Sequence, residues 1–142
     1  MAIQETLVHV LFLAQHLNNC DPQCVIITAL LELGIPTKRS GFDLLKKAIL
    51  VSYRRPDFTI HEVFCEIGKY YEAEPSFEQI DQAIRAAITD AWKYRDENVW
   101  QCYFPQVMAQ GIRKPSNAEF ITQLARLVEL WAGCRKEPVY ER

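Results

Sequence analysis

The sequence lacks the patterns that mark several large classes of protein. Its 142 residues include only five glycines, and these form no glycine-rich loop of the kind that cradles phosphates. No apolar run approaches the roughly 20 residues that a membrane-spanning helix needs. No basic stretch precedes the first apolar segment, as one would in a signal peptide. Strand patterns are nearly absent. We therefore expect a protein that is neither secreted nor bound to a membrane.

Cysteine usage and motif spacing argue against metal binding and catalysis. The five cysteines are scattered through predicted helices, which is typical of reduced thiols in a cytoplasmic protein. Zinc-ligand spacing and a nucleophile elbow are both missing. His61 and Cys65 lie one helical turn apart, but a buried cysteine beside an exposed histidine is the commoner explanation. We expect no metal, no cofactor and no enzymatic activity.

Helix-capping signals recur along the chain and predict an all-α fold. Asp21 followed by Pro22 is typical of a helix start, and Gly34 is typical of a helix end. Ser40 is expected to cap the next helix. Three capping boxes open later helices, at positions 59–62, 76–79 and 116–119. The expected helices span residues 3–18, 22–33, 41–55, 60–71, 77–94, 98–104 and 117–133.

The chain is long enough for one hydrophobic core, and no repeat or linker divides it. We expect a single domain of six to seven helices over residues 21–133. An extra N-terminal helix within residues 1–20 would pack on this domain. Residues 134–142 would form a charged C-terminal tail.

Charge is unevenly distributed, although the net charge is only −2. Residues 38–55 carry six basic side chains and one acidic one, whereas residues 57–81 carry seven acidic side chains and one basic one. A nucleic-acid-binding protein gathers its positive charge where the phosphates pass. Here the basic segment and the predicted reading helix are different parts of the chain, which argues against DNA binding.

Three blocks of sequence resemble one known family in the same order. The first runs from Leu33 to Pro36 and continues from Ser40 to Ile49; the others are residues 82–92 and 114–121. Together they are similar to the C-terminal DNA-binding effector domain of the stage-zero sporulation response regulator, over residues 22–133. The resemblance implies a helical domain that contains a helix-turn-helix and binds double-stranded DNA. It also implies a bacterial, cytoplasmic regulator of transcription.

The helices expected at 60–71 and 77–94 have the form of a helix-turn-helix. The second resembles the recognition helix of the family, whose first two turns enter the major groove. A glutamine side chain can form paired hydrogen bonds with adenine, and an arginine side chain can bind guanine or a phosphate. This surface is therefore chemically able to read bases. Its outward residues are Glu78, Gln79, Asp81, Gln82 and Arg85.

Phosphate contacts are predicted at two flanking positions. Lys46 and Lys47 belong to the basic segment, and a solvated helix face is the simpler explanation for them. Arg113 and Lys114 match a part of the family that contains basic residues. With Arg85, these side chains would hold the DNA backbone.

The sequence also departs from the family at the reading helix. The family carries several basic residues on the outward face, whereas this chain has Gln79 and Gln82 there, and only Arg85 keeps its charge. The turn before the helix is about two residues longer and contains Glu72 and Glu74, which would repel phosphates. The alternative function is therefore a protein–protein interaction module that has the fold without DNA binding.

In the family, a receiver domain with a phosphorylated aspartate controls dimerisation. Here only one apolar helix stands in its place, so the resemblance implies no phosphorylation switch. Such a broad apolar surface indicates contact on two sides, which predicts a homodimer. The simpler alternative is a helix that is wholly buried in its own domain. Its apolar residues are Ile3, Leu7, Val8, Val10, Leu11, Phe12, Leu13 and Leu17.

Overall fold

The computed structural model describes residues 21–135. Within this range every helix or strand assigned is an α-helix, which confirms the all-α prediction. The expected N-terminal helix and most of the C-terminal tail lie outside the described residues. The seven helices of the described range are α2 (Pro22–Leu33), α3 (Ser40–Arg54), α4 (Ile60–Gly68), α5 (Phe77–Lys93), α6 (Glu97–Tyr103), α7 (Pro105–Ala109) and α8 (Asn117–Arg135).

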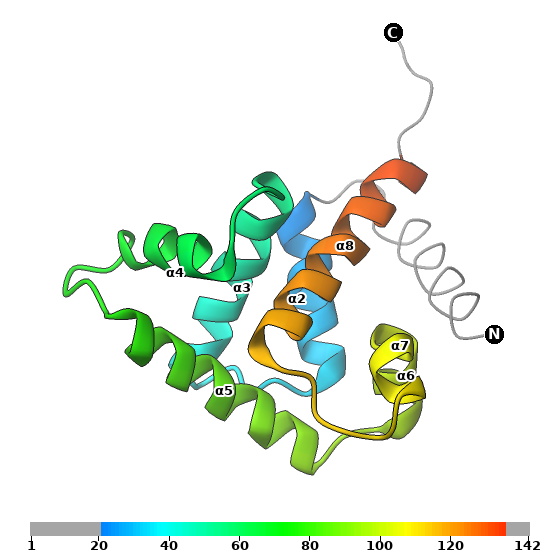
Figure 1. Cartoon of the computed structure of the whole chain (residues 1–142). Helices are drawn as coiled ribbons and strands as arrows, with labels where there is room; N and C mark the ends of the chain where they lie inside the picture. The colour runs from blue at the N-terminus through cyan, green and yellow to red at the C-terminus, as the bar shows by residue number, and fades with distance from the viewer. Residues whose placement is uncertain (1–20, 136–142) are drawn as a thin grey trace, which may run out of the picture.

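Helix α3 lies at the centre of the fold and packs against α2, α4, α5 and α8 (Figure 1). Its residues Leu45, Ala48 and Ile49 are completely buried, and they belong to one continuous cluster of apolar side chains drawn from every described helix. Burial of so much apolar surface is the main force that holds the helices together. The largest buried side chains are Trp100, Trp131, Tyr103, Phe64, Phe104 and Phe120.

Local capping determines where most helices begin. The Asp21 side chain accepts a hydrogen bond from the Cys24 N–H at the start of α2, and Gly34 ends that helix with a left-handed φ of 85°. Both features confirm the sequence prediction. The capping boxes that open α4 and α5 are also present, each with its two reciprocal hydrogen bonds.

Two predicted boundaries were wrong, and one helix was missed. Ser40 is the first residue of α3 and not its cap; Arg39 takes the cap position without a side-chain hydrogen bond. Helix α4 ends at Gly68 because the next residues form tighter turns, with the Tyr71 N–H donating to the Gly68 carbonyl. The short helix α7 was not predicted. It begins at Pro105, whose ring suits the first helical position after the chain bends at Phe104.

The crossing of α3 and α5 is unusually close at Gly41. A Cβ atom at this position would lie 2.5 Å from the carbonyl oxygen of Ala83 and 2.7 Å from the Cβ of Ala87. Only glycine therefore allows the two helices to approach this closely. The contact fixes α5 on the central helix and so determines the direction in which its outer face points.

Candidate nucleic-acid interface

Helices α4 and α5 pack against each other and form a helix-turn-helix. The Phe77 ring, at the first position of α5, lies 5.1 Å from the rings of both His61 and Phe64 on α4. This aromatic cluster holds the start of α5 against α4. The side of α5 that faces the core carries Ile80, Ile84, Ala87, Ile88 and Ala91, all buried.

Two of the predicted reading residues extend freely from the opposite side of α5. Glu78 and Gln82 are exposed and form no side-chain hydrogen bond within residues 21–135. Gln79 is exposed too, but its side-chain oxygen accepts the Ser76 N–H at 2.9 Å as part of the capping box. Paired hydrogen bonds to adenine need both the oxygen and the amide of a glutamine. Gln82, whose oxygen and amide are both unoccupied in the described part of the chain, is therefore better able than Gln79 to bind a base.

Asp81 turns toward α8 and does not point outward as predicted. One carboxylate oxygen accepts a hydrogen bond from the Asn117 amide at 2.8 Å, and the other lies 2.5 Å from Arg85. The Asn117 amide also donates to the Asp81 main-chain oxygen at 3.0 Å. Asp81 thus connects the first turn of α8 to α5 and orients Arg85, whose side chain remains exposed.

Lys46 and Lys47 lie on the α3 side of the helix-turn-helix, where both approach Asp43. The Nζ atoms are 3.7 Å and 2.6 Å from the carboxylate oxygens. Tyr71, just after α4, donates its hydroxyl to the same carboxylate at 2.5 Å. Burial raises the pKa of Asp43, but the hydrogen bonds from Lys47 and Tyr71 lower it by more. The ionised carboxylate neutralises part of the positive charge and ties the turn to α3.

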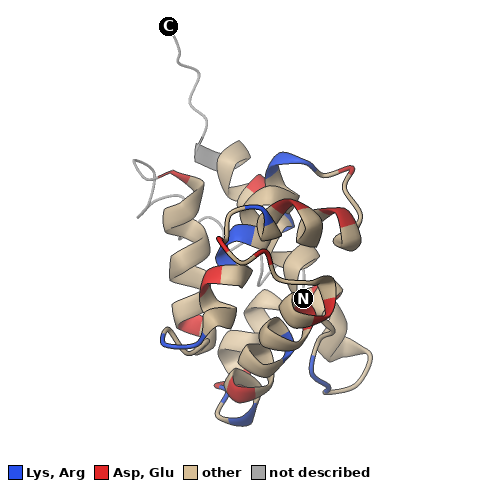
Figure 2. Cartoon of the chain, turned by 90° about the vertical axis from the view of Figure 1, so that its left-hand side faces the viewer, with Lys and Arg blue, Asp and Glu red and all other residues tan. Residues whose placement is uncertain are grey.

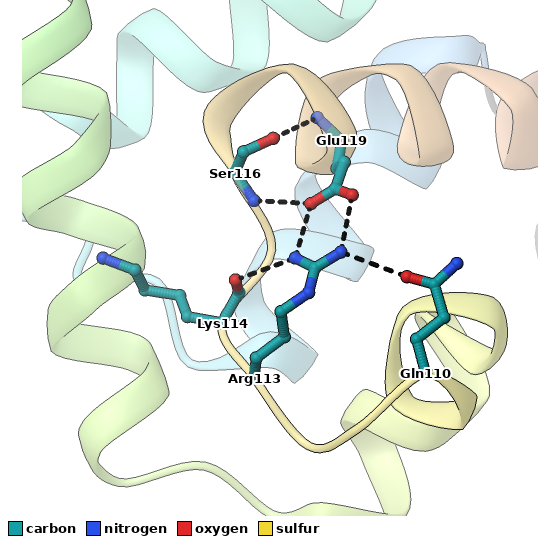
Figure 3. Close-up of polar contacts among 5 residues, drawn as sticks. All are labelled: Gln110, Arg113, Lys114, Ser116 and Glu119. Carbon is teal, nitrogen blue, oxygen red and sulfur yellow. Dashed lines mark hydrogen bonds and ion pairs between the residues drawn. The ribbon is translucent and has the colours of Figure 1, made fainter.

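Arg113 and Lys114 lie on the other side of α5, in the connection between α7 and α8 (Figure 3). Both terminal nitrogens of Arg113 lie 2.9 Å from the carboxylate of Glu119, and one of them also reaches Gln110 at 3.3 Å. Lys114 donates to the Thr89 hydroxyl on α5 at 2.7 Å. Arg113 therefore orders the connection, while the side chain of Lys114 reaches α5.

The contacts of Glu119 predict a response of stability to pH. Hydrogen bonds from Arg113 and from the Ser116 N–H lower the pKa of Glu119 from its ordinary 4.5 to about 2. Since the folded-state pKa is lowered, the carboxylate stabilises the fold above pH 4.5, and this contribution disappears as the pH falls from 4.5 to 2.

Wild-type protein should therefore lose more unfolding free energy over that pH range than the Glu119→Gln variant. The difference should be small, because exposed ion pairs contribute little to stability. Urea unfolding of both proteins at several pH values measures it. Parallel losses in the two proteins would show that the Arg113–Glu119 pair does not stabilise the fold.

Acidic side chains surround the start of α5. Glu72, Glu74 and Glu78 are all exposed, and none pairs with a basic side chain in the described part of the chain. Figure 2, which views the molecule from the side of α4, shows both signs of charge on this side. A phosphate at the first turn of α5 would therefore meet repulsion as well as attraction.

The described residues show neither a metal-binding cluster nor a membrane-spanning helix. Among residues 21–135, no three His, Cys, Asp or Glu side chains are grouped so that they could hold a metal ion. None of the described helices is long and apolar enough to cross a membrane. Cys65 is exposed, so the expectation of a buried cysteine was wrong; His61 beside it stacks on Phe77.

A helix-turn-helix within an all-helical domain is an arrangement typical of DNA-binding effector domains. Residues 26–128 match the family described as sporulation initiation factor Spo0A, C terminal. The chain belongs to this family, as the resemblance of its three sequence blocks indicated. The match runs from α2 into α8 and contains the whole α4–α5 pair. It is a family of DNA-binding regulatory domains and not of enzymes.

Proposed function

We propose that this protein binds double-stranded DNA and regulates transcription, with α5 as the helix that reads the bases. The main support for the proposal is that the outer face of α5 is exposed in a helix-turn-helix of this family. Gln82 and Arg85 lie on this face, one turn apart. Gln82 would bind adenine and Arg85 would bind guanine or a phosphate. Bacterial DNA lies in the cytoplasm, so we propose a cytoplasmic location.

The basic residues beside α5 would contact the DNA backbone from both sides. Lys46 and Lys47 would do so from α3, and Arg113 and Lys114 from the connection before α8. Most of these cations are already paired with a carboxylate, which a phosphate would have to replace. Exposed ion pairs contribute only about 0–1 kcal/mol, so this replacement costs little.

Titration of a labelled random-sequence duplex tests the proposal. Even non-specific DNA binding by a protein of this kind gives dissociation constants of about 10⁻⁴–10⁻⁶ M at physiological salt, and tighter ones at low salt. We expect binding in low salt that weakens steeply as salt is added. No binding at about 100 μM protein in low salt would contradict DNA binding.

A second function, a protein–protein interaction module, is favoured by the charges near the reading helix. Glu72, Glu74 and Glu78 present carboxylates there, and Asp81 holds the one basic residue of the reading surface, Arg85. Such a surface would suit a basic protein partner. The duplex titration separates the two functions, since an interaction module would bind no DNA.

Replacement of Glu72 and Glu74 by glutamine should strengthen DNA binding. The change removes two negative charges beside the proposed phosphate path, so affinity should rise by a few-fold, and more at low salt than at high salt. Fluorescence anisotropy of a labelled duplex measures the effect. The control is Glu129→Gln on α8, which removes an exposed carboxylate in another helix. A fall in affinity for the double variant would contradict the docking of α5.

We also propose a homodimer, formed through the apolar N-terminal segment. Such pairing would place two reading helices on adjacent DNA sites. The segment lies outside the described residues, so the support comes from its apolar pattern alone. Sedimentation of the full chain tests the idea, and a monomer at tens of micromolar would contradict it.

A further inference from the structure

We propose that the last two turns of α5, together with the two connections that meet them, form an edge that binds the phosphates of duplex DNA. This edge consists of Lys38, Lys93 and Lys114, and we call it the C-terminal edge of α5. The inference rests on the proposed DNA binding. It adds a docking site at the end of the helix opposite to the one that enters the groove in the usual helix-turn-helix arrangement.

Two connections converge on neighbouring residues of α5. Arg39, in the connection before α3, places its Nε atom 2.6 Å from a carboxylate oxygen of Asp90. Lys114, in the connection before α8, places its Nζ atom 2.7 Å from the Thr89 hydroxyl. Three separate parts of the chain therefore meet at Thr89 and Asp90.

Lys93 lies at the same place on the helix. It follows Thr89 by four positions and Asp90 by three, and side chains at these spacings are neighbours on a helix surface. Lys93 is exposed and forms no ion pair with any residue of the described range. Its ammonium group is therefore available to a phosphate.

Lys38 and Lys114 complete the edge. Lys38 directly precedes Arg39, is exposed, and likewise has no ion pair in the part of the chain that the structure describes. Lys114 hydrogen-bonds to a neutral hydroxyl and so keeps its charge uncompensated. The carboxylate that faces the edge, Asp90, is already paired with Arg39.

The next carboxylates along the chain also have partners, although the hydrogen bonds of Asp96 leave its negative charge in place. Asp96 caps α6 by accepting the N–H groups of Asn98 and Val99. Glu97 is 2.8 Å from Arg95, whose guanidinium also lies 3.7 Å from the centre of the Trp92 ring. The helix dipole places a partial negative charge of about half an elementary charge at the end of α5. This charge is smaller than the summed positive charge of the three lysines.

The charged side chains in and beside α5 therefore differ in sign at its two ends. The exposed carboxylates Glu72, Glu74 and Glu78 lie at its start, and the three lysines lie at its end. A helix of 17 residues is about 25 Å long, several times the screening length of about 8 Å at physiological salt. The carboxylates at the start of α5 would therefore repel phosphates at the C-terminal edge only weakly. The DNA backbone should follow this end of the helix.

Salt-dependent DNA binding of the full chain tests this inference. Lys38→Gln and Lys93→Gln should each weaken binding to a random duplex about 3–10-fold in low salt, and each should reduce the slope of log affinity against log salt by about 0.9. The charge-retaining Lys93→Arg variant should bind like the wild type. The matched control is Arg126→Gln, which removes an exposed basic side chain on α8 and should leave the slope unchanged.

The outcomes separate the inference from the proposed function. If the wild type binds DNA but Lys38→Gln and Lys93→Gln behave like Arg126→Gln, the C-terminal edge is not a binding site, and DNA binding stands. If the wild type binds no duplex DNA, the proposed function fails and this inference fails with it. Both lysines are exposed, so an unchanged melting temperature of each variant would show that the fold is intact.

Discussion

The Gly41→Ala variant should lose about 3 kcal/mol of unfolding free energy, at the upper end of the usual cost of overpacking. The added Cβ would lie 2.5 Å from the main-chain oxygen of Ala83, and a backbone atom cannot move aside as the end of a side chain can. Alanine favours a helix over glycine by about 1 kcal/mol, which offsets only part of this cost. Urea unfolding monitored by circular dichroism measures the change.

Gly133→Ala is the matched control for this prediction. Gly133 also lies in a helix, α8, but a Cβ atom there would meet no atom within 4 Å. The same substitution should therefore stabilise the protein, by up to about 1 kcal/mol. If Gly41→Ala were as stable as the wild type, α3 and α5 could not cross as closely as the structure has them.

Gln82→Ala and Arg85→Ala should each weaken binding to a specific DNA site by roughly 1–3 kcal/mol, about 5- to 150-fold. Gln82 has no other partner among the described residues, so its loss should leave stability unchanged. Arg85 pairs with Asp81, but Asp81 keeps its hydrogen bonds to Asn117 when the arginine is removed. Anisotropy titrations at fixed salt measure both effects.

The control for these two variants is Gln106→Ala, which removes an exposed glutamine on α7. It should bind DNA like the wild type. Unchanged affinity in both Gln82→Ala and Arg85→Ala would exclude the outer face of α5 from the interface.

The sequence predicted the parts of this structure that depend on local interactions. A capping box acts within four residues, so the starts of α4 and α5 could be recognised from Thr59 and Ser76. The buried side of α5 followed from helical periodicity in the same way. Both predictions needed only the chemistry of neighbouring residues.

The arrangement around α5 could not be predicted, because it depends on contacts between distant parts of the chain. Asn117 contacts Asp81 across 36 positions, and Lys114 contacts Thr89 across 25. No local pattern distinguishes these polar residues from others on a helix surface. The prediction that Asp81 points outward was wrong for this reason.

The ion pairs of the basic residues around α5 could be predicted from the sequence in part. Arg85 follows Asp81 by four positions and Lys47 follows Asp43 by four, a spacing that allows an ion pair on a helix. The role of Tyr71, which donates to Asp43, depends on how the turn folds back on α3 and had no signal in the sequence.

Selection from a random pool of duplexes tests most directly whether α5 reads DNA. The wild-type chain and the Gln82→Ala variant would each be incubated with the pool at fixed salt, and the bound sequences determined. Our account predicts that the wild type enriches a defined site and that the variant loses base preference at one position of it, where the wild type selects adenine. The same site with undiminished preference in both proteins, or no enrichment by the wild type, would contradict it.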